Sequence, residues 1–147
     1  MPRKKWPPPG FPIVEGQHLL TETWAINLPG KFARHVEDGC LVLWRPGLTI
    51  WLEAWGNDRN ESQAKRLKTI KSHASPDRFS ESEGKANKIT RYSYRLRDEN
   101  ENGSIDSVYA HILNDDGHLQ LAIYFDDAKD EPIARAIADC VMERERA

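Results

Sequence analysis

Apolar and polar residues alternate along much of this chain, most clearly in its last third. Positions 118–125 place Leu, Leu, Ile and Phe at every second residue, the period-2 pattern of a strand with one buried face. Apolar residues then recur at helical spacing across 133–141. The two patterns together predict a strand whose buried face is covered by an amphipathic helix.

The same pattern predicts more strands, joined mostly by short turns. Asp38-Gly39 and Asp116-Gly117 are strong two-residue hairpin signals. Pro29-Gly30 is expected to end the first strand, and Pro46-Gly47 suits a reversal between two strands. The predicted strands are 19–28, 32–37, 40–45, 48–55, 88–97, 105–114 and 118–125.

One further segment, 60–74, has helical spacing, and Asn60 is its expected N-cap. The polar segment 75–87 contains Pro76 and Gly84 and predicts a loop. Because neighbouring strands are linked by short turns, the sheet should be mostly antiparallel. The predicted fold class is therefore α+β, a sheet of about six to seven strands packed with two helices.

At 147 residues the chain has the length of one domain. Residues 1–18 are rich in proline and predict an N-terminal arm in extended polyproline conformation, followed by a single α+β domain over 19–147. No apolar run approaches 18 residues, and the basic start has no apolar segment behind it. We therefore expect a cytoplasmic protein that makes no membrane contact.

Charge is spread unevenly although the net charge is only −2. Residues 57–97 carry 11 basic and 5 acidic side chains, whereas residues 98–131 carry 1 and 10. Neighbouring strands from the two segments would neutralise each other. A charged docking face is the alternative interpretation, with Arg91 and Arg95 as candidate contacts.

The sequence contains no recognisable catalytic or metal-binding motif. The five histidines and two cysteines lack metal-ligand spacing, and phosphate-loop and nucleophile-elbow motifs are absent. Acidic residues at 126–131 precede the last predicted helix, where Asp126 or Asp127 is expected to cap it. We predict a protein that is not an enzyme and has no metal or cofactor.

Nucleic-acid binding is also not expected from the basic segment. Single-strand binders interleave aromatic and cationic side chains on one face. Alternation in 88–97 instead places Tyr92 and Tyr94 opposite to Arg91 and Arg95. We therefore predict no specific binding of nucleic acid.

The predicted strand 48–55 is apolar on both faces, so it is either buried on both sides or exposed on one side for a partner. Tryptophan is favoured at protein interfaces, and Trp44, Trp51 and Trp55 are candidate contacts. The predicted function is non-catalytic binding of another protein. The alternatives are a small-ligand-binding or hydrolytic protein using His111, His118 and nearby acidic residues, and a structural homodimer.

The order of these elements resembles the PsbP-like superfamily of α/β/α sandwiches. The resemblance is carried by a strand ending in Leu28-Pro29, a run of hairpins, a helix, and an apolar-Tyr-Phe-Asp-Asp segment at 123–127 before a closing helix. It covers roughly residues 19–145. It implies a binding role, and a bacterial immunity protein or a chaperone for a secreted effector is the expected kind of member.

Overall fold

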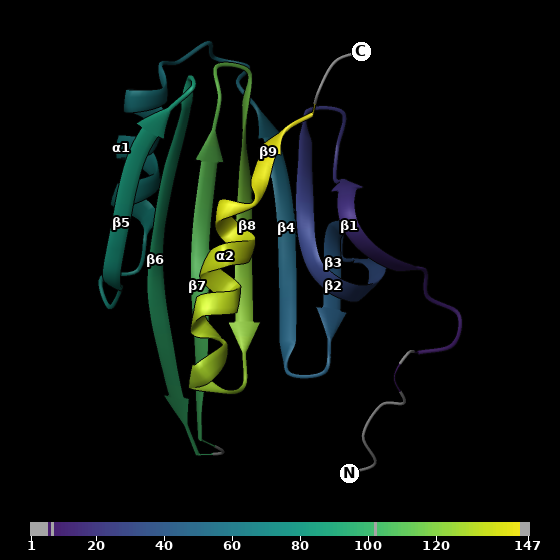
Figure 1. Cartoon of the computed structure of the whole chain (residues 1–147). Coiled ribbons are helices and arrows are strands. Elements are labelled where there is room, and N and C mark those ends of the chain that lie inside the picture. Colours follow the sequence, from purple (N-terminus) through teal and green to yellow (C-terminus); the bar gives the residue numbers. More distant parts are fainter. Residues whose placement is uncertain (1–5, 7, 102, 145–147) are drawn as a thin grey trace.

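The computed structural model describes residues 6, 8–101 and 103–144 of the chain. Residues 1–5 and 7 of the predicted arm, and Asn102 of a predicted turn, lie outside these residues. Within the described residues, nine strands form one antiparallel sheet, with an α-helix on each of its faces (Figure 1).

The strands follow the order β1-β2-β3-β4-β8-β7-β6-β5, and the short β9 pairs with the first residues of β2 on the side away from β1. A 3₁₀ turn at Ala128–Asp130 precedes α2. The bounds are β1 Ile13–Leu19, β2 Trp24–Glu37, β3 Cys40–Arg45, β4 Leu48–Gly56, α1 Gln63–His73, β5 Phe79–Ala86, β6 Ile89–Asn100, β7 Gly103–Leu113, β8 Gly117–Phe125, α2 Glu131–Asp139 and β9 Val141–Glu143.

Both hairpins predicted from turn residues are present, although the two turn residues between β7 and β8 are Asp115 and Asp116 rather than Asp116-Gly117, and Gly117 is the first residue of β8. Asp38 and Gly39 both have positive φ, 51° and 81°, and Glu37 pairs with Cys40 across them, as a two-residue hairpin turn requires. Gly47 has a φ of 82° between β3 and β4. In the β7–β8 turn, the Asn114 side chain accepts hydrogen bonds from the backbone N–H groups of Asp116 and Gly117. These turns set the register of the central strands.

The predicted fold class, a balanced α+β sandwich of six to seven strands, is wrong. The described chain is a mostly-β fold with more strands and only two short α-helices. The largest difference is β5, which occupies the segment predicted as a loop and is exposed along its whole length. It is an edge strand held by backbone pairing with β6. Because neither of its faces is buried, its sequence does not alternate between apolar and polar residues, and the strand could not be predicted from that pattern.

Two boundaries near the N-terminus also differ from the prediction. The edge strand β1, Ile13–Leu19, is formed by the last six residues of the predicted arm together with Leu19. Pro29-Gly30 does not end a strand, because β2 continues through it. The pairing shifts at this point: Val14 faces Phe32 and Gly16 faces Leu28, so Pro29 sits in an irregular stretch where its missing N–H does not break the ladder.

The two faces of the sheet carry two separate apolar clusters. α2 buries Ala134, Ile137 and Ala138 against the main core, to which every second residue of β4, β7 and β8 contributes. Neither Asp126 nor Asp127 caps this helix as predicted: its N-cap is Asp130, which makes no side-chain capping bond, and Asp127 instead caps the preceding 3₁₀ turn by accepting from the Lys129 N–H. Figure 1 shows α2 lying across β7 and β8.

On the opposite face, α1 lies behind β5 and β6 in the view of Figure 1. It packs Leu67 and Ile70 against a smaller cluster that contains Tyr92 and Tyr94. Its N-cap is Ser62, whose side chain accepts from the Lys65 N–H, rather than the predicted Asn60. α1 therefore covers one end of this face.

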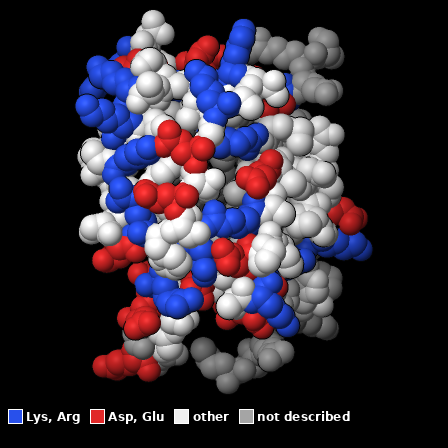
Figure 2. Space-filling model, turned by 60° about the vertical axis from the view of Figure 1, so that its left-hand side comes forward, with Lys and Arg blue, Asp and Glu red and all other residues white. Residues whose placement is uncertain are grey.

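The basic and acidic segments are neighbours in the sheet, which agrees with mutual neutralisation. Arg95 and Arg97 of β6 both pair with the buried Asp106 of β7, and Arg95 also pairs with Glu131. In Figure 2, Lys and Arg side chains lie among Asp and Glu side chains over the side of the molecule that holds α1 and β5. Among the described residues, neither helix is long and apolar enough to cross a membrane.

Candidate functional site

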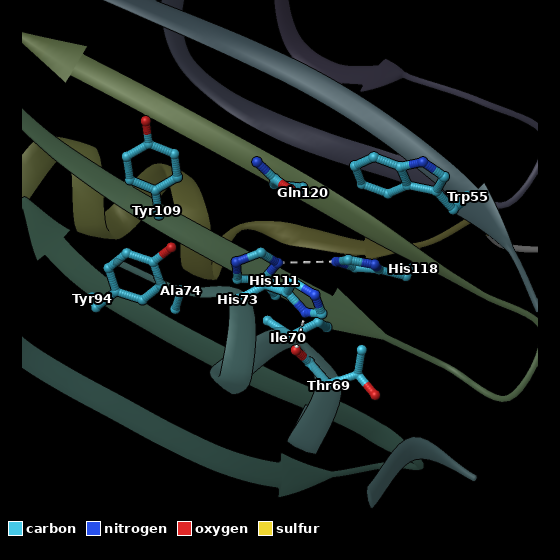
Figure 3. Close-up of a pocket in the computed structure, with 10 residues that line it drawn as sticks. All are labelled: Trp55, Thr69, Ile70, His73, Ala74, Tyr94, Tyr109, His111, His118 and Gln120. Carbon is cyan, nitrogen blue, oxygen red and sulfur yellow. Dashed lines mark hydrogen bonds between the residues drawn. The ribbon is translucent and has the colours of Figure 1, made fainter. Parts of the chain in front are cut away.

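A groove of about 520 Å³ lies beside α1, between the helix and the open part of the sheet. We call it the aromatic groove, because aromatic rings make most of its wall (Figure 3). The helix α1 contributes one side, and β4, β6, β7 and β8 contribute the floor. The lining residues are Trp55, Thr69, Ile70, His73, Ala74, Tyr94, Tyr109, His111, His118 and Gln120.

Sheet register brings two histidines of this floor together. His118 of β8 faces Leu113 of β7, so His111 is its diagonal neighbour on the same face. His111 Nδ1 and His118 Nε2 are 3.0 Å apart, a hydrogen-bond distance that Figure 3 marks with a dashed line. His111 is 6% exposed, and its other nitrogen, Nε2, is buried with no hydrogen-bond partner among the described residues.

Burial keeps both imidazoles uncharged at neutral pH. Desolvation lowers the pKa of His111 from 6.5 to about 4. It also lowers the pKa of His118, to about 3, with smaller contributions from His111 and the Arg66 guanidinium. At pH 7 the pair therefore shares one internal hydrogen bond and carries no net charge.

Trp55 closes the same end of the groove. It faces His118 across the β4–β8 pairing, and the two rings stack with centroids 5.0 Å apart. Gly117, the residue before His118, lets the strands approach closely: a Cβ on it would lie 2.5 Å from the Trp55 carbonyl oxygen. Trp55 as a whole is 45% exposed, so its side chain is available to a ligand.

Two tyrosines form the other end of the groove. The rings of Tyr94 and Tyr109 stack with centroids 5.5 Å apart and an interplanar angle of 9°. The Tyr109 hydroxyl is hydrogen-bonded to the Tyr124 hydroxyl at 2.7 Å. Burial raises the pKa of Tyr94 and of Tyr109, so both phenols remain uncharged at physiological pH.

Side chains of α1 fix the wall of the groove to the β7–β8 turn. The Arg66 guanidinium donates to the backbone carbonyls of Asn114 and Gly117. Gln63 is buried, accepts from the Thr90 hydroxyl at 2.6 Å, and donates to Asp115. These bonds connect the helix directly to the turn that positions His118, which makes the groove a preformed feature.

A smaller hollow of about 240 Å³ adjoins the groove over β4 and β8. Trp51 and Tyr124 line it, and it shares Tyr109 and Gln120 with the aromatic groove. Trp51 is half-buried and Trp55 is exposed, while Leu48, Ile50 and Leu52 of the same strand are in the core. Of the two interpretations of the doubly apolar strand, the structure therefore supports one face left open.

The predicted contact residues divide between the two faces. Trp44, Trp51 and Trp55 lie on the face of the groove, with Trp44 in edge contact with Trp6. Arg91 and Arg95 lie on the opposite face, where Arg91 donates to the Val141 carbonyl at 2.5 Å. Arg91 also donates to the Ala138 carbonyl of α2 at 3.5 Å, and Arg95 pairs with Glu131 at the start of the same helix. Both arginines therefore hold α2 against the sheet, and neither lines the groove.

His111 and His118 are predicted site residues only under the alternative function, and the tyrosines and Gln120 are not predicted as site residues. The sequence did contain a signal for the histidine pair. A tight turn at 114–117 pairs Leu113 with His118, which places His111 and His118 on the same face of the sheet. What covers that face could not be read from the pattern. Among the described residues, no group of three or more His, Cys, Asp and Glu side chains could hold a metal ion.

Known proteins give no further information about the function of the aromatic groove. No protein-family model matches the chain, and no curated protein matches it. The resemblance to the PsbP-like superfamily remains a prediction, and any function proposed for the chain has to rest on the aromatic groove itself.

Proposed function

We propose that this chain is a non-catalytic binding protein whose aromatic groove holds a small, uncharged, largely apolar ligand. The observation that carries the proposal is the chemistry of the groove wall. Its volume falls within the usual range of ligand sites, roughly 300–1,000 Å³, and such sites are mostly apolar with a few placed polar groups. Here those polar groups include His111, His118 and Gln120 on the floor and Thr69 and His73 on α1.

The groove wall has no charged side chain among its ten described residues, although 30% of the chain is Asp, Glu, Lys or Arg. A random sample of ten residues at that frequency would contain about three. An ionic ligand would lose hydration on entering and would find no counter-charge on the wall. The composition of the wall therefore favours a ligand that is neutral at physiological pH.

His111 and His118 are poorly suited to act as catalytic acids or bases. A general base works best when its pKa lies near the operating pH, and burial lowers the pKa of His111 to about 4 and that of His118 to about 3. Neither imidazole hydrogen-bonds a carboxylate in the described structure; they hydrogen-bond each other. These observations support binding rather than turnover.

Blocking the groove tests the proposal. Indole and 4-fluorophenol serve as uncharged aromatic probes, and their binding at pH 7.5 is followed by saturation-transfer NMR. Thr69 is exposed on α1 and lines the groove, so Thr69→Trp should fill its mouth and weaken binding at least tenfold. Ala64 is exposed on the same helix outside the groove, and Ala64→Trp is the matched control.

The proposal is wrong if neither probe binds the unmodified protein. It is also wrong if Thr69→Trp and Ala64→Trp bind both probes equally well, because the probes would then occupy another place. Circular dichroism and thermal unfolding of both variants establish that each is folded before binding is compared.

Binding of another protein is a second candidate, and the open aromatic face favours it. Trp55 is exposed, and Trp51 and Tyr124 line the adjoining hollow; aromatic side chains of this kind anchor protein interfaces. An immunity protein or effector chaperone would use this face. Self-association is its simplest form: light scattering should give a dimer mass that Trp51→Glu converts to a monomer mass, and a monomer throughout would exclude the homodimer.

A further inference from the structure

One half-buried amide on the floor of the aromatic groove has no hydrogen-bond partner. Gln120 of β8 lines both the groove and the adjoining hollow, and no other described residue hydrogen-bonds its side chain. The amide of Gln63, by contrast, is fully used, because it bonds to Lys88, Thr90 and Asp115. The Gln120 amide is therefore free to bond a ligand in the groove.

Sheet register places this amide between two aromatic side chains. Trp55 faces His118 across the pairing of β4 with β8. Tyr109 faces Ala122 across the pairing of β7 with β8. Gln120 lies two residues from each of these positions along β8, roughly 7 Å in either direction, and Figure 3 shows its side chain between the Trp55 and Tyr109 rings. A planar ring bonded to the amide can therefore rest against either aromatic side chain.

The chemistry of an amide side chain sets what it can recognise. Its oxygen accepts and its nitrogen donates, and both atoms are attached to the same carbon. Such a group forms two parallel hydrogen bonds with a ligand edge that presents an adjacent donor and acceptor, as glutamine does with the edge of adenine. A half-turn about the last side-chain bond exchanges the oxygen and the nitrogen, so either order on the ligand is matched.

We propose that the Gln120 amide is the polar anchor of the aromatic groove, and that it selects an uncharged aromatic ring bearing a carboxamide or a lactam. This inference rests on the proposed function, since it names the ligand class of the same groove. The ligand ring lies along the aromatic wall, and its polar edge forms two hydrogen bonds with the one amide.

An anionic ligand is poorly matched to this anchor. A carboxylate presents only acceptors, so it would bond the amide nitrogen and leave the amide oxygen facing another acceptor. It would also approach Glu53, which faces Gln120 across the pairing of β4 with β8 and repels a second negative charge. The Glu53 carboxylate does not line the groove, and it accepts a hydrogen bond from the Cys40 thiol at 2.9 Å.

Three compounds of nearly the same shape separate these cases. Benzamide presents an adjacent donor and acceptor, acetophenone carries a methyl group in place of the amino group, and benzoate is an anion with acceptors only. NMR titration of the unmodified protein at pH 7.5 should give benzamide a dissociation constant at least fivefold lower than those of the other two, because each of them loses one hydrogen bond to the anchor.

The same titration reports where benzamide binds. The side-chain N–H signals of Gln120, assigned in the unmodified protein, should shift as benzamide saturates the groove. Gln17 is exposed on β1 outside the groove, and its side-chain signals should stay in place.

The Gln120→Leu variant keeps a side chain of similar size and removes both hydrogen-bonding atoms. It should no longer bind benzamide more tightly than acetophenone. The matched control Gln17→Leu should keep the full preference for benzamide. The ranking of the three compounds and the Gln120 signals of the unmodified protein decide the matter even if Gln120→Leu does not fold.

The possible failures are distinguishable. If indole and 4-fluorophenol bind but benzamide is not preferred over acetophenone, the groove remains a binding site and Gln120 is not its anchor. The same conclusion follows if the Gln120 signals do not move when benzamide binds, or if Gln120→Leu keeps the preference. If none of these aromatic compounds binds, both this inference and the proposed function are overturned.

Discussion

Acidification should destabilise this protein through the His111–His118 pair. In an unfolded chain a histidine has a pKa of about 6.5, whereas burial lowers the pKa to about 4 for His111 and about 3 for His118 in the fold. Between pH 6.5 and 4 the unfolded chain therefore binds protons that the folded protein excludes. The stabilisation is complete above pH 6.5 and is lost as the pH falls through this window.

The size of the effect follows from the same values. At pH 5.0 each imidazole takes up nearly one proton on unfolding, which favours the unfolded state by about 2 kcal/mol per histidine relative to pH 7.5. The pair should together remove about 4 kcal/mol, a large share of the roughly 5–15 kcal/mol that stabilises a typical domain.

The assay is urea unfolding at pH 7.5 and pH 5.0, followed by tryptophan fluorescence. Carboxylates also titrate in this range, so the informative quantity is the difference between variants. His111→Leu should lose about 2 kcal/mol less than the unmodified protein on going to pH 5.0. Equal losses in the two proteins would refute a buried, uncharged imidazole at His111.

Two further variants test how the sheet and α2 are held. Gly117→Ala places a methyl group 2.5 Å from a carbonyl oxygen of β4 and should lower the free energy of thermal unfolding by about 1–3 kcal/mol. In the control Gly84→Ala the new methyl group meets nothing within 4 Å, so stability should hardly change. Similar melting temperatures for the two variants would contradict the clash at Gly117. Arg91→Met removes the hydrogen bond to the Val141 carbonyl and should lower the free energy of unfolding by about 1–2 kcal/mol. Binding of the probes in the groove should not change. Weaker probe binding with unchanged stability would show instead that Arg91 contacts the ligand.

The central strands and turns could be predicted because their signals are local. The alternation in β4 and β8, the left-handed Asp38-Gly39 turn and the apolar stripe of α2 each depend on residues close together in the sequence. The edge strand β5 could not be predicted in this way. It is exposed throughout, and only the neighbouring strand β6 makes it a strand.

The orientation of the arginines and tyrosines of β6 was also determined by the sequence. Alternation alone places Arg91 and Arg95 opposite to Tyr92 and Tyr94, because successive side chains of a strand point to opposite faces. Which face would be covered was not determined. The arginines lie on the face that α2 covers, and the tyrosines lie under α1, because the two helices pack on opposite faces of the sheet.

The aromatic groove belongs to the tertiary structure. The sequence fixes which side chains share a face of β4, β7 and β8, since a strand has a period of two. How far α1 extends over that face depends on bonds such as those of Arg66 to the β7–β8 turn, between residues about fifty positions apart. His111 is buried, and therefore uncharged, because α1 packs over this face. The order of apolar and polar residues cannot predict that burial, since it depends on which other element packs above a residue.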